Sequence, residues 1–251
     1  MNASKQAAPA NRLLAALPAQ SRQQFLANCE QVELEFGQVL CEAGGRIRYV
    51  YFPLDSFISL ITTLDDGARL EIGMIGDEGM LGMSLILGVN ISSQHAVVQG
   101  AGSALRISAT AFSRHCKASA ALQLGMSRYV YVLMCQRAQT AACSHYHRVE
   151  ARLARWLLMT RDRAHSNRFR LTHEFLAYML GVRRVGITAA ASSLHALGLI
   201  NYSRGEIVIL NNAGLEKASC NCYRDGEAMY AQTLGLRPRA SPRTVAKQTS
   251  Q

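Results

Sequence analysis

Residues 171–210 have the sequence LTHEFLAYMLGVRRVGITAAASSLHALGLINYSRGEIVIL, which predicts a short helix, a glycine turn, a longer helix and a hairpin. Thr172 can cap the first helix with its hydroxyl, and Gly181 tolerates the left-handed conformation that ends such a helix. The inward side of this helix is expected to hold Phe175, Leu176, Met179 and Leu180. This order of elements is the layout of a winged helix-turn-helix, so the sequence predicts double-stranded DNA as a partner.

The second helix is expected from about Arg184 to Leu197, because apolar residues recur there at helical spacing. Its inward stripe is predicted to contain Ile187, Ala190, Ala191, Leu194 and Leu197. Its outward face is small and mostly uncharged, with Val185, Thr188, Ala189, Ser192 and Ser193. After Gly198, apolar and β-branched segments flank a turn over residues 203–206, which predicts a two-stranded wing with a basic tip.

This arrangement resembles the C-terminal domain of the Crp/Fnr family of bacterial transcription regulators, and the likeness covers about residues 13–210. Residues 72–88, IGMIGDEGMLGMSLILG, are similar to the glycine-rich loop and short helix of that family's cyclic-nucleotide-binding β-roll. The resemblance implies an α+β protein with an N-terminal, jelly-roll-like β-roll sensor, a long dimerisation helix and a winged helix-turn-helix domain. We expect these parts over residues 11–117, 118–144 and 145–235, followed by a disordered basic tail over 236–251.

The N-terminal half is predicted to be mainly β-structure, since short β-rich segments occur at residues 32–40, 49–52, 57–64, 70–74, 93–99 and 104–107. Glycines at positions 73, 76, 79, 82 and 88 make an unusually open loop among them. Such glycines either let the backbone approach a ligand or turn the corners of the roll. The sequence leaves both interpretations open for Gly79 and Gly82.

The resemblance also bears on the effector. In family members that bind a cyclic nucleotide, the glycine-rich loop carries a glutamate for the ribose hydroxyl, and a downstream arginine pairs with the phosphate. The corresponding positions here are Met80 and Gln94, followed by His95. Without a guanidinium there is no charge-assisted fork for a phosphate. We therefore expect a divergent member that binds cyclic AMP poorly or not at all and has no cofactor.

Another small effector would use a pocket made by Gly79, Met80, Gly82, Gln94 and His95. The alternative for Gln94 and His95 is an ordinary place in a turn or on the surface.

A long helix is predicted between the two domains, because residues 118–142 lack proline. Leu122, Met126, Tyr129 and Leu133 follow one another at spacings of four, three and four, which is typical of a heptad seam. The resemblance makes this the dimer helix, with those residues in the interface of a homodimer. Two-fold symmetry would then place two recognition helices on major grooves ~34 to 36 Å apart. The alternative is a helix buried within its own domain.

The first turn of the second helix is expected to enter the major groove, where Arg184 can bond the edge of a guanine. Relatives with well-known sites carry an arginine, a glutamate and a second arginine along this helix. The first matches Arg184, whereas the others fall on Val185 and Ala189, which offer only apolar contact to a base. Residues expected to contact phosphates and set the position on the duplex are Arg183, Thr188, Ser192, Ser193, Ser203 and Arg204.

The charge of the chain is concentrated in its C-terminal half. The net charge is +10, of which residues 1–144 contribute +1, from 11 basic and 10 acidic residues. Residues 145–251 contribute +9, from 16 basic and 7 acidic residues. A basic domain joined to a nearly neutral one is typical of proteins that bind the phosphate backbone.

The seven cysteines are scattered and odd in number, which favours reduced thiols and a cytoplasmic location over a disulfide framework. No apolar run approaches the ~20 residues that cross a bilayer, and no signal peptide is expected. The closely spaced N-terminal cysteines of the relatives that bind an iron–sulfur cluster are absent, because only Cys29 and Cys41 lie in that region.

Two further groups of residues raise a metal or redox role. Cys143 and His147, with His145 between them, have an acceptable i, i+4 spacing for a metal but no obvious third ligand. Cys220 and Cys222 are either a thiol switch or ordinary structural cysteines. No metal site is therefore predicted.

Enzymatic interpretations find no support, because P-loop, dinucleotide, His-Glu-x-x-His and Gly-x-Ser-x-Gly motifs are absent from the sequence. The favoured function is a homodimeric, sequence-specific transcription regulator, which as an activator would also contact RNA polymerase. The main alternative is an effector-binding or protein-interaction module whose degenerate recognition helix binds DNA without specificity. A third interpretation, which the sequence favours least, is a hydrolase or transferase with its active site in the β-roll.

Overall fold

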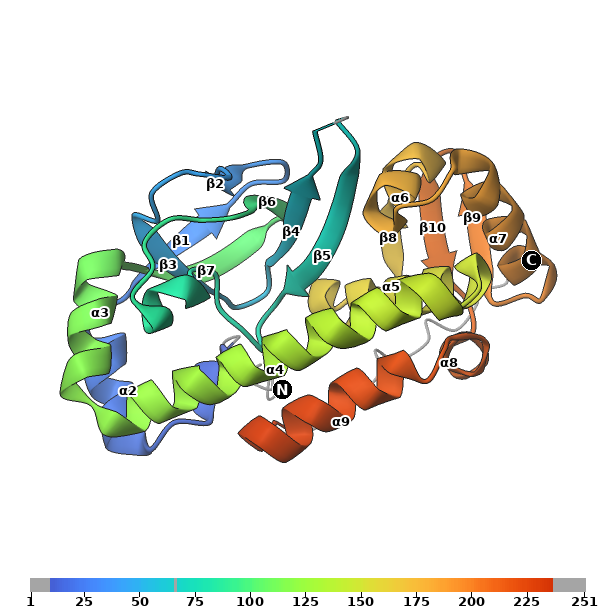
Figure 1. Ribbon diagram of the computed structural model, residues 1–251. Helices are drawn as coiled ribbons and strands as arrows, with labels where there is room; N and C mark the ends of the chain where they lie inside the picture. The colour runs from blue at the N-terminus through green and yellow to red at the C-terminus, as the bar shows by residue number, and fades with distance from the viewer. Residues whose placement is uncertain (1–9, 66, 237–251) are drawn as a thin grey trace, which may run out of the picture. The chain divides into compact units, whose positions relative to one another are not determined.

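The computed structural model describes residues 10–65 and 67–236 (Figure 1). The described chain forms two compact units. The first contains residues 10–60, 73–133 and 232–236, and the second contains residues 61–72 and 134–231. Residues 237–251 of the expected basic tail lie outside the described part, whereas Leu236, the first residue assigned to that tail, is buried.

The first unit is built on two antiparallel sheets, with strand orders β1-β7-β3 and β2-β6-β4-β5. Its strands are β1 Glu30–Leu34, β2 Val39–Cys41, β3 Tyr49–Pro53, β6 His95–Gly100 and β7 Gly102–Ser108. The strands β4 Phe57–Thr63 and β5 Arg69–Ile75 are divided between the units, with residues 61–63 and 69–72 in the second. Its short helices are α1 Arg12–Ala15, α2 Ala19–Leu26, the 3-10 helix η1 Met83–Leu87 and α3 Ala109–Ala118. This architecture confirms the predicted β-roll.

The predicted β-rich segment 32–40 forms parts of two strands, and the chain breaks at Gly37, one of the glycines expected to split these segments. Gly37 has a φ of +80°, and its N–H donates to the carbonyl of Val98 at 2.9 Å. This left-handed residue turns the chain between β1 and β2, a conformation that a residue with a Cβ adopts only with strain.

The helix α4 spans Ala120–Tyr146 and is 27 residues long. The predicted dimer seam lies on its inward side: Leu122, Met126, Tyr129 and Leu133 are at most 6% exposed within the single chain. This burial favours the alternative of a helix buried in its own domain, and a role of these residues in a dimer interface stays a prediction. A repeat of seven identifies an apolar stripe but does not say which surface covers it.

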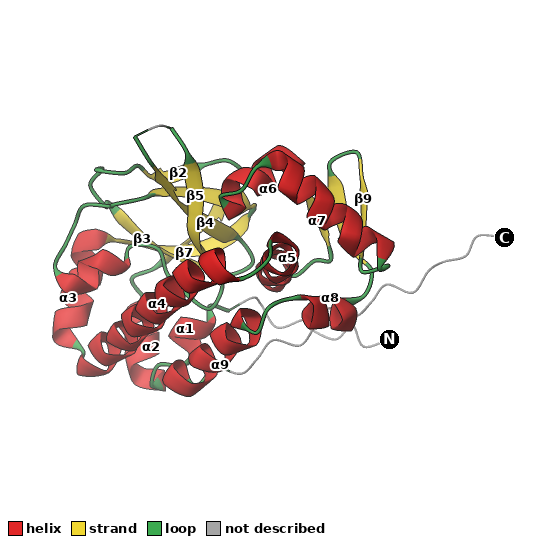
Figure 2. Ribbon diagram, turned by 45° about the vertical axis from the view of Figure 1, so that its right-hand side comes forward, coloured by secondary structure: helices red, strands yellow, loops and turns green. Residues whose placement is uncertain are grey.

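The second unit contains α5 Val149–Ala164, β8 Arg168–Arg170, α6 His173–Leu180, α7 Arg184–Ala196, β9 Ile200–Ser203, β10 Glu206–Ile209, α8 Asn212–Ala218 and α9 Cys222–Leu234. Figure 2 shows α6 and α7 as consecutive helices, with β9 beside them. The sheet of this unit has the order β8-β10-β9, so the expected two-stranded wing has a third strand. Within the described residues, no helix is both long enough and apolar enough to cross a membrane.

Gly79 shows how tightly α4 packs on the glycine-rich loop of the first unit. A Cβ built at Gly79 would lie 2.3 Å from the hydroxyl oxygen of Tyr129, which in turn donates to the carbonyl of Met80 at 3.4 Å. The absence of a side chain at position 79 is therefore explained by the close approach of the α4 tyrosine.

Gly79→Ala should lower the free energy of unfolding by about 1 to 3 kcal/mol, because the added methyl group overlaps a side chain that is itself fully buried. Gly73→Ala is the matched control, since a Cβ there meets nothing within 4 Å. The control should leave stability unchanged or raise it by ~0.5 to 1 kcal/mol. Urea unfolding measures both variants, and equal stability of the two would contradict the packing explanation.

Candidate nucleic-acid interface

The first helix of the helix-turn-helix begins and ends as the sequence predicts. The side chain of Thr172 accepts a hydrogen bond from the backbone N–H of Phe175 at 3.1 Å. Gly181 ends the helix in the left-handed conformation, with a φ of +61°. These two local contacts fix the length of α6 and so set where α7 can start.

The second helix, α7, has one buried and one exposed face. Its buried face consists of Ile187, Ala190, Ala191 and Leu194, as predicted. Leu197, which the sequence pattern adds to this stripe, is 62% exposed, because the helix ends at Ala196 and Gly198 follows in a left-handed conformation. On the outward face, Val185 is 72% exposed. Of its companions, Thr188, Ala189 and Ser192 are exposed and Ser193 is half-buried.

Positive charge frames the start of α7. Arg183 is the N-cap residue and Arg184 is the first helical residue, and both side chains are exposed. Neither has an ion-pair partner among the described residues. Two free guanidinium groups beside the positive end of a helix dipole favour binding of a polyanion.

The wing ends in a two-residue turn between β9 and β10, which pair through Ser203 and Glu206. Both turn residues have positive φ values, +51° for Arg204 and +77° for Gly205, as a tight hairpin of this kind requires. The side chain of Arg204 is exposed at the tip. On the neighbouring strand β8, Arg168 forms a salt bridge with Glu206 at 2.8 Å.

His173 connects α6, α7 and the wing. Its Nδ1 lies 3.0 Å from the hydroxyl of Thr188, and its ring stacks on Tyr202 with centroids 4.2 Å apart. The hydroxyl of Thr188 also donates to the carbonyl of Arg184 at 3.1 Å. Thr188, expected to contact a phosphate, is therefore already engaged within the domain, and its role in DNA binding stays a prediction.

The residues expected to form an effector pocket lie in the first unit and have other partners. Gly79 and Met80 are buried beneath Tyr129, and Gly82 turns the chain with a φ of +100°. The side-chain amide of Gln94 donates to Ser93 at 2.9 Å, and His95 is paired with the carboxylate of Glu42. A pocket of this unit is lined by other residues, including the cations Arg46, Arg48, Arg114 and Lys117. The effector role of the five predicted residues stays a prediction.

Two family models match the chain. Residues 31–119 match a cyclic nucleotide-binding domain, and residues 151–218 match a Crp-like helix-turn-helix domain. No curated protein matches the sequence.

Several solved structures share the fold. FixK2 from Bradyrhizobium japonicum is 14% identical with a TM-score of 0.65, and the match covers 76% of this chain and 98% of that one. The c-di-GMP responsive global regulator CLP of Xanthomonas campestris is 17% identical with a TM-score of 0.63, covering 76% and 99%. A CRP family transcriptional regulator from Thermus thermophilus, TTHB099, is 18% identical with a TM-score of 0.62, covering 75% and 96%. At these identities the likeness establishes the fold.

The environment of His173 predicts a pH dependence of stability. Burial lowers the pKa of His173 below its usual 6.5, and the positive charge of Arg184 lowers it further by a smaller amount. Protonation therefore favours the unfolded chain, so the stabilising contribution is complete above pH 6.5 and is lost as the pH falls through the lowered pKa. Below pH 6.5, the free energy of unfolding should fall more steeply for the native protein than for His173→Gln. Urea unfolding over a pH series measures this, and parallel curves would contradict it.

Proposed function

We propose that this chain acts as a homodimer that reads a two-fold symmetric operator with α7. The chain belongs to the Crp/Fnr family of DNA-binding transcription regulators. The single observation that carries the proposal is the exposed face of α7 with Arg183 and Arg184 unpaired at its start. This face carries apolar and hydroxyl side chains, and two arginines precede it in the chain. Such a face is better suited to a DNA major groove than to packing in a protein core.

In this proposal Arg184 bonds the guanine edge of one base pair. Val185 and Ala189 add apolar contact to thymine methyl groups, and their exposure supports that role. Arg183, Ser192, Ser193, Ser203 and Arg204 bind phosphates, as does Thr188 once its hydroxyl is released. Base reading thus rests on few side chains, and phosphate contacts provide most of the affinity.

We assign dimerisation to the face of α4 that the single chain leaves uncovered. Leu124, Tyr131 and Met134 are 53%, 58% and 64% exposed, at spacings of seven and three. The same heptad positions continue through Ala138, Ala141 and His145, all exposed. The opposite face holds the buried residues, including Met126 and Tyr129, so a second copy would meet this exposed stripe and not the buried one.

The first unit is proposed to act as the effector sensor of a cytoplasmic regulator. Met80 is fully buried and Gln94 carries no charge, which supports our expectation that cyclic AMP is not the effector. Activation of transcription would add RNA polymerase as a partner.

A second candidate function is binding of DNA without sequence specificity, as part of an effector-binding or interaction module. The observation that favours it is the lack of charged side chains on the outward face of α7 between Val185 and Ser193. Such a face offers few hydrogen bonds to base edges. The two candidates differ in the ratio of specific to non-specific affinity.

Arg184→Ala should reduce discrimination at one operator base pair by ~1 to 3 kcal/mol, whereas Arg204→Ala should weaken binding to every duplex alike. The native protein should prefer its operator over random duplex by at least ~10³, with an affinity that falls steeply as salt rises. Operators come from mapping bound DNA across the genome, and fluorescence anisotropy measures the affinities. Equal binding to all duplexes supports the second candidate, and a footprint unchanged by both substitutions rejects the assigned contacts.

The dimer assignment predicts that a charge on the exposed stripe prevents association. Tyr131→Glu combined with Met134→Glu should weaken the dimer by about 3 kcal/mol or more, over ~100-fold, because unpaired carboxylates would be buried in the interface. Leu87→Glu is the matched control, since that leucine is also 64% exposed but lies in η1. Sedimentation velocity measures the oligomeric state, and a double variant that remains dimeric contradicts this interface.

A further inference from the structure

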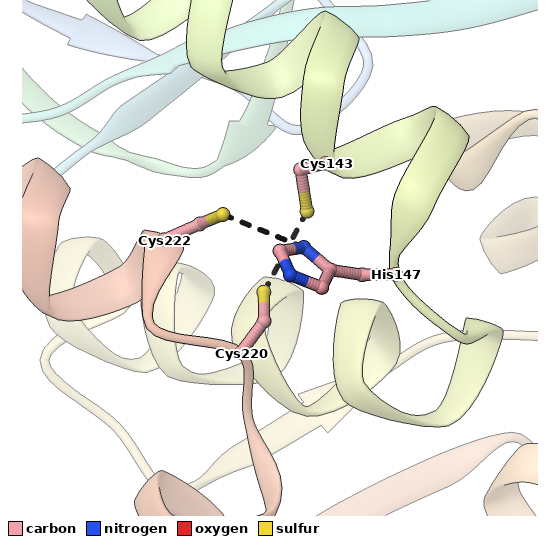
Figure 3. A group of neighbouring side chains, drawn as sticks. All are labelled: Cys143, His147, Cys220 and Cys222. Atoms are coloured by element: carbon pink, nitrogen blue, oxygen red, sulfur yellow. Dashed lines mark hydrogen bonds between the residues drawn. The ribbon is translucent and has the colours of Figure 1, made fainter.

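Four potential metal ligands from two distant parts of the sequence meet in the second unit: Cys143, His147, Cys220 and Cys222 (Figure 3). The sulfurs of Cys143 and Cys220 are 3.6 Å apart. The sulfur of Cys222 lies 3.6 Å from Nδ1 of His147. All four ligand atoms lie within 4.8 Å of one another.

The fold holds each half of this cluster in place by contacts that do not involve sulfur. Cys143 lies in the last turn of α4, and His147 is the first residue after that helix, where its N–H still donates to the carbonyl of Cys143 at 3.1 Å. The other half is the start of α9, which is anchored by Tyr223. Its hydroxyl donates to Asp162 at 2.7 Å and accepts from Arg161 at 2.9 Å, both on α5.

Further along, α9 lies beside the C-terminal part of α4 (Figure 1). The side-chain amide of Gln139 donates to Asp225 at 3.0 Å, and the hydroxyl of Tyr230 donates to Gln136 at 3.3 Å. Two of the ligands, Cys143 and Cys222, thus lie in helices that are tied to each other, and the other two lie within two residues of a helix end.

The cysteines are buried but belong to no larger apolar core. Cys143, Cys220 and Cys222 are 1%, 8% and 7% exposed and form a cluster of their own, against which Ala151 packs. Buried cysteines usually serve as small apolar residues within a core. Here three cysteines form a separate cluster, and an exposed histidine lies beside them. Metal ligation explains this arrangement better than core packing does.

The charges around the cluster suit an anionic site. Arg152 is 9% exposed, and its guanidinium donates to the backbone carbonyls of Ser144, at 3.4 Å, and Leu180. Among the described residues it has no carboxylate partner. Three thiolates and a neutral imidazole around a divalent ion carry a net charge of −1, which a neighbouring buried guanidinium would offset.

We propose that Cys143, His147, Cys220 and Cys222 bind one divalent ion in tetrahedral geometry. The ion belongs to the class that binds thiolates well, of which Zn²⁺ is the representative. Zinc–sulfur bonds of ~2.3 Å in a tetrahedron separate neighbouring sulfurs by ~3.8 Å, close to the spacing found here. A polynuclear iron–sulfur cluster would hold its thiolates on different iron atoms and hence farther apart. Binding releases the thiol protons to solvent and changes no oxidation state.

Four protein ligands leave no open coordination position, so the ion has a structural role. It joins the end of α4 to the start of α9 and thereby fixes the border of the helix-turn-helix domain. All four ligands lie outside residues 31–119 and 151–218, the ranges that the two family models match. The sequence did not bring the two pairs together, because they become neighbours only when α9 returns to α4.

The test uses the full chain, purified under reducing conditions, stripped with a chelator and titrated with Zn²⁺ or Co²⁺. We expect one ion per chain and a higher midpoint of thermal unfolding on loading. Co²⁺ should give the intense visible absorption of a tetrahedral thiolate complex. Outer-shell changes alone commonly cost 10- to 100-fold in metal affinity, so Cys222→Ser and His147→Ala should each lower Zn²⁺ affinity by at least ~100-fold.

Two substitutions serve as matched controls and should retain native affinity. Cys135→Ser removes another α4 thiol, and His145→Ala removes an exposed histidine two positions from His147. Failure of the native protein to take up stoichiometric Zn²⁺, equal losses in the controls, or iron accompanied by inorganic sulfide would overturn the proposal. If the ligand variants do not fold, the Co²⁺ spectrum of the native chain decides, since lack of tetrahedral absorption rejects the site.

Discussion

The structure depends on the burial of α4, a long helix with large apolar side chains on more than one side. Its first half is fixed by side chains such as Met126 and Tyr129, which are fully buried in the first unit. Each such side chain contributes about 1.5 to 3 kcal/mol when it leaves water. Leu124, Tyr131 and Met134 face away from that core, and each is more than half exposed.

The same helix packs against the backbone of the glycine-rich loop. Tyr129 occupies the space above Gly79, and its hydroxyl bonds the carbonyl of Met80, so the loop backbone is used for packing. A ligand that approached this backbone would have to displace a buried tyrosine. The chemistry left for an anion in the first unit lies elsewhere, in the pocket lined by Arg46, Arg48, Arg114 and Lys117.

The features predicted correctly from the sequence are those fixed by neighbours in the chain. Thr172 and Gly181 bound α6 because capping and left-handed turns involve only three or four residues. The apolar stripe on α4 could be predicted but not the surface that covers it, because periodicity reports amphipathicity alone. The thiol cluster was missed for a related reason. Cys143 and Cys222 are brought together by the return of α9, which the Tyr223 network with Arg161 and Asp162 directs.

In the proposed complex with DNA, α7 offers few side chains that can read bases, so specificity depends more on the geometry of the dimer. One arginine and two apolar side chains distinguish few base pairs, whereas phosphate contacts hold any duplex alike. Selection of an operator then requires that two recognition helices meet their half-sites at a fixed separation, with the sequence-dependent shape of the DNA between them. In the proposed dimer, that separation depends on how firmly the end of α4 is joined to the DNA-binding domain. An ion that ties the last turn of α4 to α9 would stiffen this junction, so the thiol cluster lies where rigidity matters most for recognition.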